Sequence, residues 1–285
     1  MRSCIMKGRK EVLTMKKRLL CLLLTLALPF GLCACKEEPS VPTASDDLAS
    51  QTTPEPPPEP DPAEVYVDGL TLEQQVAQLF FARCPDVDAA DLAAQYDIGG
   101  YILFGRDFEG QTPESVTQTI QSYQDAAATP MLIGVDEEGG TVTRVSLYSA
   151  FRAAGRFQSP QALFAEGGLK RIEEDTVEKD ALLASLGINV NLAPVCDVST
   201  DPADFINARA FGQDAQATSE YVRTVVEQMK TDGMGMVLKH FPGYGSNVDT
   251  HTGIAQDTRP IEQFREVDFL PFSAGIDAGA QAVLV

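Results

Sequence analysis

From residue 71 to the end of the chain, short apolar runs alternate with longer amphipathic segments. The apolar runs predict strands over residues 100–104, 131–135, 188–192, 235–238 and 282–285. The amphipathic segments predict helices over residues 113–127, 166–186, 214–232 and 261–278. The pattern Thr71-Leu72-Glu73-Gln74 has the form of a capping box and predicts one more helix, with Leu72, Val76, Leu79 and Phe80 on one face.

This alternation predicts an α/β fold with a parallel sheet. Short strands that are buried on both faces suit a barrel, so we expect a (β/α)8 TIM-type barrel. About six of its eight strands precede Val285, and we expect the barrel to continue in a longer gene product. A doubly wound sheet is the other fold that places its ligand at strand ends. The chain has no Gly-x-Gly-x-x-Gly sequence and no phosphate-binding loop, so we expect no nucleotide cofactor.

The first 35 residues have the pattern of an export signal. Basic residues at 16–18 precede an apolar run over 19–28 that is short for a membrane-spanning helix. The run leads to Leu32-Cys33-Ala34-Cys35, which resembles a bacterial lipoprotein signal and implies lipid attachment at Cys35. Such an anchor would hold the exported protein at the extracytoplasmic face of the cell membrane without spanning it. A plain secretory signal or a membrane anchor is the alternative.

Residues 36–64 are rich in Pro, Glu, Asp, Ser and Thr and contain few apolar side chains. Such a segment cannot bury enough surface to offset the entropy of ordering, and we expect a disordered, extended tether. The expected organisation is therefore a lipoprotein signal over residues 1–35, a linker over 36–64 and the barrel domain over 65–285.

The chain carries 41 acidic and 22 basic residues, a formal net charge of −19. An acidic surface repels phosphate backbones, so nucleic acid is not an expected partner. The six cysteines do not suggest a disulfide framework, because signal cleavage would remove three of them and lipid would occupy Cys35. The other two, Cys84 and Cys196, lie in apolar or strand-like contexts, and we expect both in the core, with a bridge between them as the alternative.

Polar side chains lie where the predicted strands end. Asp136 follows the strand over 131–135, and Lys239 and His240 follow the strand over 235–238. Arg209 lies in the segment after the strand over 188–192. Because the carboxyl ends of barrel strands converge on one rim, where active sites lie, we expect a site there.

The only two histidines of the chain, His240 and His251, lie in one loop that contains glycine and proline. Asp249 stands two residues before His251, where its carboxylate can accept a hydrogen bond from one ring nitrogen. That bond would fix the tautomer and make the other nitrogen a suitable general acid or base. The alternatives are a local turn contact, or a metal site formed by His240, Asp249 and His251.

Five segments follow one another in the order of a known family. They are Gly134-Val135-Asp136-Glu137-Glu138-Gly139-Gly140 followed by Arg144, Asn191-Leu192-Ala193-Pro194-Val195-Cys196-Asp197-Val198, Asn207-Ala208-Arg209-Ala210-Phe211-Gly212, Lys239-His240-Phe241-Pro242-Gly243 and Asp249-Thr250-His251. Together they resemble glycoside hydrolase family three, in its β-N-acetylhexosaminidase branch, over about residues 66–285. Tyr244 stands where that family often has His, and the following loop is shorter than in some members.

The resemblance implies hydrolysis of terminal, non-reducing β-linked N-acetylglucosamine from peptidoglycan fragments or related glycans. It implies that His251, oriented by Asp249, protonates the leaving oxygen, and it implies no cofactor and no metal. The remaining matched side chains would bind the sugar ring through charge-assisted hydrogen bonds: Asp136, Arg144, Arg209, Lys239 and His240.

Retention of configuration also needs a carboxylate nucleophile. None of the matched residues fills this role, and we expect the nucleophile beyond Val285. We expect Asp197 to support a hydrogen-bond network at the rim instead. Two other functions stay open: a family-three β-glucosidase, which normally lacks the Asp249 and His251 pair, and a non-catalytic sugar-binding lipoprotein if Val285 is the natural end.

Overall fold

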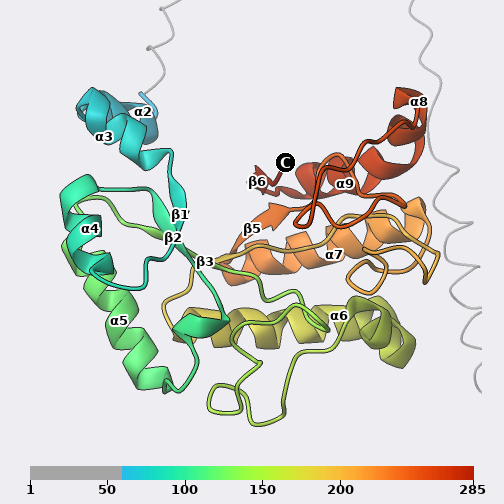
Figure 1. Ribbon diagram of the computed structural model, residues 1–285, viewed down its shortest axis with the longest axis horizontal. Coiled ribbons are helices and arrows are strands. Elements are labelled where there is room, and N and C mark those ends of the chain that lie inside the picture. Colours follow the sequence, from blue (N-terminus) through green and yellow to red (C-terminus); the bar gives the residue numbers. More distant parts are fainter. Residues whose placement is uncertain (1–59) are drawn as a thin grey trace, which may run out of the picture. The chain divides into compact units, whose positions relative to one another are not determined.

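The computed structural model describes residues 60–285 (Figure 1). The expected signal peptide, its lipidation site Cys35 and the linker as far as residue 59 lie outside the described residues. Helix α2 (Pro62–Asp68) begins within the segment 36–64 that we expected to be a tether, with Asp61 as its N-cap. No helix within the described range is both long and apolar enough to cross a membrane.

Six parallel strands form one sheet, and their order in the sheet follows their order along the chain. They are β1 (Phe81–Arg83), β2 (Gly100–Leu103), β3 (Leu132–Val135), β4 (Val190–Asn191), β5 (Gly235–Leu238) and β6 (Ala282–Val283). A doubly wound sheet reverses its strand order at a switch point, whereas successive strands of a (β/α)8 barrel are always neighbours. The expected α/β fold with barrel-type strand order is therefore confirmed.

Helices connect the strands and pack on one another around the sheet (Figure 1). They are α3 (Leu72–Gln78), α4 (Ala89–Tyr96), α5 (Pro113–Ala126), α6 (Pro160–Ser185), α7 (Ala215–Asp232), α8 (Ile261–Gln263) and α9 (Phe269–Ala278), with a 3₁₀ turn at Gly105–Asp107 and a π turn at Phe264–Asp268. The packed pairs are α4 with α5, α6 with α7, and α7 with α9. The last predicted helix, over 261–278, is thus interrupted by a π turn.

Helix α6 begins earlier than the sequence pattern predicted. Its N-cap is Ser159, whose hydroxyl accepts a hydrogen bond from the Ala162 N–H at 3.3 Å. Gly167 and Gly168 then depart from helical geometry, with φ of 67° at Gly168. The predicted helix over 166–186 therefore corresponds to the part of α6 from this break onward.

The strands are covered on both faces. In β5, Met236 and Leu238 belong to the large core cluster shared with the helices, whereas Val237 belongs to a second, smaller cluster. Because side chains alternate between the faces of a strand, the smaller cluster lies on the opposite face of the sheet. It also contains Val190 and Leu192, and Phe81 packs against it.

Gly134 in β3 leaves the space that this smaller cluster needs. A Cβ atom at Gly134 would lie 2.4 Å from Cζ of Phe81 and 3.1 Å from Cδ1 of Leu192. The glycine therefore admits the Phe81 ring between the strands, a close approach that any side chain would prevent.

The capping box predicted at the start of α3 is confirmed. The Thr71 hydroxyl accepts a hydrogen bond from the Gln74 N–H, and the Gln74 side chain accepts one from the Thr71 N–H. The apolar face of this helix is exposed within residues 60–285, with Leu72 at 70% and Leu79 at 83% exposure.

Candidate active site

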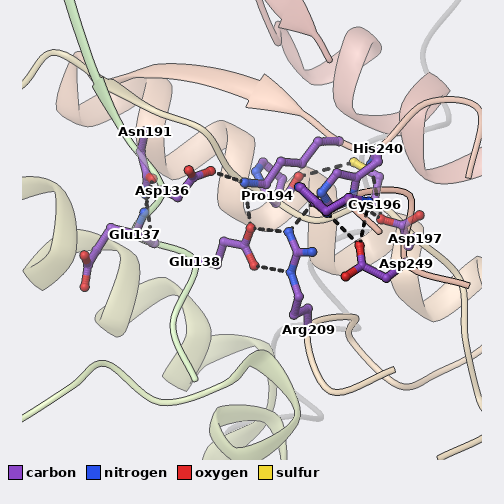
Figure 2. Close-up of polar contacts among 12 residues, drawn as sticks. Asp136, Glu137, Glu138, Asn191, Pro194, Cys196, Asp197, Arg209, His240 and Asp249 are labelled. Atoms are coloured by element: carbon purple, nitrogen blue, oxygen red, sulfur yellow. Dashed lines mark hydrogen bonds and ion pairs between the residues drawn. The ribbon is translucent and has the colours of Figure 1, made fainter. Parts of the chain in front are cut away.

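Side chains from the ends of four segments meet at the carboxyl edge of the sheet (Figure 2). Asp136 and Glu138 follow β3, Asp197 follows β4, Arg209 comes from the segment before α7, and Lys239 with His240 follows β5. Their hydrogen bonds and ion pairs form one continuous network, listed from one end to the other as Asp136, Lys239, Glu138, Arg209, His240 and Asp197. The structure places these side chains at the carboxyl rim, where we expected a site.

Lys239 is the buried cation of the network. Its side chain is 2% exposed, and its Nζ lies 2.6 Å from Oδ1 of Asp136 and 2.6 Å from Oε1 of Glu138. A buried ammonium group is costly unless carboxylates and hydrogen bonds compensate for the lost water. Here two carboxylates compensate, and Asp136, whose side chain is 18% exposed, is the one that a ligand can reach.

Glu138 binds the second cation in a bidentate arrangement. Arg209 donates from Nε to Oε2 at 3.0 Å and from Nη2 to Oε1 at 2.8 Å. Burial alone would raise the pKa of the Glu138 carboxyl, but Lys239 and Arg209 together outweigh burial and hold that pKa below its ordinary value. Glu138 is therefore an anion, and it positions both cations.

The hydrogen bonds of His240 define its tautomer. Arg209 Nη2, which can only donate, lies 2.9 Å from Nε2 of His240, so Nε2 is the acceptor. Nδ1 therefore carries the proton and donates it to Oδ2 of Asp197 at 2.8 Å. The same oxygen accepts the His240 backbone N–H at 3.1 Å, and Oδ1 accepts the Tyr244 N–H at 2.8 Å. The expectation that Asp197 supports a hydrogen-bond network is confirmed.

Asp249 and His251 form the hydrogen-bonded pair that their spacing suggested. Nδ1 of His251 lies 2.7 Å from Oδ1 of Asp249, which also accepts the His251 backbone N–H at 2.9 Å. The backbone N–H and then the ring of His251 lower the pKa of the Asp249 carboxyl, with a smaller contribution from the Arg209 charge. The His251 side chain is 75% exposed, so its Nε2 edge is open to a ligand.

A hollow of about 390 Å³ connects the two histidines. His240, Tyr244 and His251 all contribute to its lining, together with Leu284 and Val285. The buried network and the exposed Asp249–His251 pair therefore border one space, although no hydrogen bond or ion pair joins them within the described chain.

Arg144 does not join the network. Its guanidinium carbon lies 6.0 Å from the centroid of the Phe104 ring, and its Nε has no hydrogen-bond partner among residues 60–285. Of the five side chains expected to bind the sugar, the structure brings together Asp136, Arg209, Lys239 and His240 and leaves Arg144 on the rim beside them.

The sequence reasoning missed three residues that build this edge. Glu138 is one; the other two, Glu137 and Asn191, fix the loop after β3. The Glu137 carboxylate accepts the backbone N–H groups of residues 144 and 145 at 2.8 Å each. Asn191 accepts the Glu137 N–H at 3.0 Å and donates to the Glu137 carbonyl at 3.1 Å. The sequence did offer a signal for these contacts, namely three consecutive acidic residues directly after a buried strand. Acidic side chains in such a position are rarely buried unless they are paired.

Comparison with known proteins identifies the family to which the chain belongs. Residues 71–285 match the model of the glycosyl hydrolase family 3 N-terminal domain. The chain belongs to glycosyl hydrolase family 3. That assignment accounts for the parallel strands in chain order and for the charged residues at their carboxyl ends.

Individual members of family 3 are similar to this chain. A β-hexosaminidase of Xanthomonas campestris is 37% identical over 196 residues, which are 67% of this chain and 58% of that protein. A family 3 β-N-acetylglucosaminidase structure from a Paenibacillus species matches with a TM-score of 0.67 and 30% identity, over 75% of this chain and 41% of the other. A β-N-acetylhexosaminidase structure from Beutenbergia cavernae matches with a TM-score of 0.60 and 28% identity, over 75% and 66%. The chain thus spans a little over half the length of its Xanthomonas relative.

Cys84 and Cys196 are both buried and free, which confirms them as core residues and excludes a bridge between them. Within residues 60–285, no group of three or more His, Cys, Asp and Glu side chains is arranged to hold a metal ion. Both ring nitrogens of His240 are already occupied, by Asp197 and Arg209. The metal site considered from the sequence therefore has no geometric support.

Proposed function

We propose that this family 3 protein hydrolyses terminal, non-reducing β-linked N-acetylglucosamine by a retaining mechanism, with Asp249 and His251 as the acid/base pair. The observation that carries the proposal is the open His251 ring, held by Asp249 at the mouth of a hollow that His240 also lines. The Xanthomonas relative is named a β-hexosaminidase, which supports the same substrate class.

The proton transfer follows from the hydrogen bond between these two residues. Nδ1–H of His251 donates to Asp249, so the exposed Nε2 is the atom that exchanges a proton with the glycosidic oxygen. The protonated ring donates to the leaving oxygen in the first step, and the neutral ring removes a proton from water in the second. The Asp249 carboxylate stabilises the charged ring without being protonated itself.

The buried network forms the floor of the sugar site in this proposal. Asp136 accepts hydrogen bonds from sugar hydroxyl groups, Lys239 and Arg209 supply fixed positive charges beside it, and the neutral His240 ring lies next to Arg209. These groups need little reorganisation when the sugar enters, because Glu138 and Asp197 already hold them. Arg144 completes the ring of sugar contacts from the rim.

We assign the role of nucleophile to none of the residues that the structure describes. Asp197 is the nearest candidate by position, but it is buried and both its oxygens accept hydrogen bonds from residues 240 and 244. A carboxylate that is committed in this way cannot attack an anomeric carbon. We propose that the nucleophile follows Val285 in the protein's full gene product.

We further propose that the protein is exported and lipid-anchored through Cys35 at the outer face of the membrane, and that its substrates are peptidoglycan fragments or related glycans. The basic and apolar pattern over residues 1–35 and the strongly negative net charge support this location. The test is incorporation of labelled fatty acid, which Cys35→Ala should abolish.

The test of the activity is hydrolysis of an aryl β-N-acetylglucosaminide by the complete protein, with the segment that carries the nucleophile, and by its His251→Ala variant. We expect the variant to lose about 10²- to 10⁴-fold in kcat, since that is the usual contribution of a general acid or base. Gln256→Ala is the matched control, because Gln256 is an exposed residue of the same loop. Unchanged turnover in His251→Ala would refute the assignment of the pair.

Two other outcomes separate the alternatives. Preference for the aryl β-glucoside over the N-acetylglucosaminide would indicate a family 3 β-glucosidase. Binding of N-acetylglucosamine without hydrolysis of either substrate would indicate a non-catalytic sugar-binding lipoprotein.

A further inference from the structure

Arg259 lies at the end of the loop that carries the proposed acid/base pair. Its Nη1 donates to both oxygens of Asp268, at 3.0 and 2.9 Å, and its Nη2 donates to the Gly243 carbonyl at 3.0 Å. Nε and Nη2 also donate to Oδ2 of Asp257, at 3.0 and 2.8 Å. One guanidinium group therefore joins the start of the loop, its last residues and the π turn that follows it.

The pair of Arg259 and Asp268 differs from an ordinary surface ion pair. The Asp268 side chain is 1% exposed, and the Arg259 guanidinium carbon lies 4.2 Å from the centroid of the Phe264 ring. Exposed ion pairs contribute little to stability, whereas removal of one partner from a buried pair is strongly destabilising. The pair is therefore a firm anchor for whatever is bound to it.

Two glycines of the loop make room for this anchor. Gly243 has a φ of 113°, and a Cβ atom there would overlap Oδ1 of Asp268. Gly245 has a φ of 54°, and a Cβ atom there would lie 2.6 Å from Cζ of Arg259. Any side chain at either position would push the loop away from the ion pair. The backbone at these two glycines is thus fitted to Arg259 and Asp268.

Between its two ends the loop is held only to itself by hydrogen bonds. Within the described chain, residues 245–256 make hydrogen bonds only to one another and to the residues that directly flank them. The hydrogen-bonded anchors of the loop are therefore Tyr244, whose N–H donates to Asp197 at 2.8 Å, and Arg259. His251 lies midway between these anchors, where release of one end would move the chain most.

We infer that Arg259 is a positioning residue for the proton transfer: with Asp268 it clamps the base of the loop and so holds the His251 ring at the hollow that both histidines line. This inference rests on the proposed function for the role of His251. Arg259 does not line that hollow itself, so it acts through the loop. Without the clamp the ring would sample more positions, and a displacement of about 1 Å can cost about 10²-fold in rate.

The test uses two substrates that differ in how much they need a proton donor. One aryl β-N-acetylglucosaminide carries a nitro-substituted, strongly electron-withdrawing phenol, which leaves without a proton; the other carries an unactivated phenol, which is protonated as it leaves. On the complete protein, kcat/KM includes the step that breaks the bond to the leaving oxygen. For Arg259→Gln we expect kcat/KM to fall about 10- to 100-fold with the unactivated substrate and to stay within about threefold with the activated one.

Three further variants make the test specific. His251→Ala should show the same dependence on the leaving group with a larger loss. Arg265→Gln is the matched control, because Arg265 is an exposed arginine of the adjoining π turn, and it should leave both values unchanged. Since Arg259→Gln alone leaves a buried carboxylate without its cation, which can prevent folding, the double variant with Asp268→Asn removes that charge too. It should show the same dependence as Arg259→Gln.

The outcomes separate this inference from the proposed function. Equal losses with both substrates in Arg259→Gln and in the double variant would overturn the inference, because a general loss of structure does not distinguish leaving groups; unchanged turnover of both would overturn it too. If His251→Ala still depends on the leaving group in either case, the hydrolase assignment stands without the clamp. If His251→Ala shows no such dependence, or the complete protein cleaves neither substrate, the proposed function fails and the positioning role fails with it.

Discussion

Asp180 is a buried carboxyl group whose ionisation should set the pH dependence of stability. It lies on α6, is 2% exposed, and neither of its carboxylate oxygens has a hydrogen-bond partner among the described residues. Burial raises its pKa; the nearby Lys179 ammonium opposes the rise and the Asp232 carboxylate adds to it, so that the pKa moves from 3.8 to about 7.

The direction of the effect follows from where the proton is bound. Between about pH 4 and pH 7 the folded state holds a proton on Asp180 that the unfolded chain has released, so stability falls as the pH rises through this window. A shift from 3.8 to about 7 corresponds to roughly 4 kcal/mol, since one pKa unit is worth about 1.4 kcal/mol. Asp180→Asn keeps the size of the side chain and cannot ionise. It should therefore be more stable than the wild type by up to about 4 kcal/mol near pH 7.5 and by less than about 1 kcal/mol near pH 4.

Urea unfolding followed by circular dichroism at several pH values measures this difference. Glu173→Gln is the matched control, because Glu173 is exposed on the same helix, and it should leave the stability curve unchanged. Asp232→Asn should give part of the stabilisation, since it removes the neighbouring negative charge. A stability gain in Asp180→Asn that stays constant across the pH range would refute the reasoning, and so would a variant that is less stable than the wild type at neutral pH.

Two further substitutions test the site and the core. Glu138→Gln leaves Lys239 with one carboxylate partner, and we expect a loss of about 3 kcal/mol at neutral pH. The pKa of Glu138 is lowered on folding, so its contribution is present above the ordinary carboxyl pKa and disappears as the pH falls through the folded-state value. The loss caused by Glu138→Gln in urea unfolding should therefore shrink in strong acid; a constant loss would contradict the ion-pair account. Gly134→Ala places a methyl group against the Phe81 ring, and overpacking of this kind costs about 1–3 kcal/mol. In thermal unfolding, the double variant with Phe81→Leu should recover part of that loss, and failure to recover would argue against the contact.

The sequence predicted those elements whose apolar spacing is regular and whose ends carry recognisable residues. Helix α7 is an example, because Asp214 caps its start and Gly233, in a left-handed conformation, ends it. Strand β1 was not predicted, because Phe81–Arg83 is short and follows α3 without a turn residue between them. Helix α4 was missed too: it has only eight residues, and its N-cap Asp88 has a left-handed backbone conformation that the sequence does not reveal.

The motifs located the site but not its internal contacts. Asp136, Lys239 and His240 could be placed at strand ends from the sequence, because parallel strands share one carboxyl edge. The bidentate pairing of Glu138 with Arg209 spans 71 positions along the chain, and no local pattern encodes such a contact. The tautomer of His240 depends on two partners from different segments, Asp197 and Arg209, and it too emerges only from the folded chain.

The local bonding of the Asp249–His251 pair determines which part of the protein can be exchanged by substitution. Its two hydrogen bonds stay inside a three-residue stretch, whereas the charged side chains of the network bind one another across several strand ends. Tyr244 links the two parts, because its hydroxyl lies 2.6 Å from that of Thr250 and its N–H donates to Asp197. Under the proposed function, an exchange of the loop around residues 249–251 would therefore change the proton donor while the charges at the strand ends stay in place, provided that Tyr244 is kept.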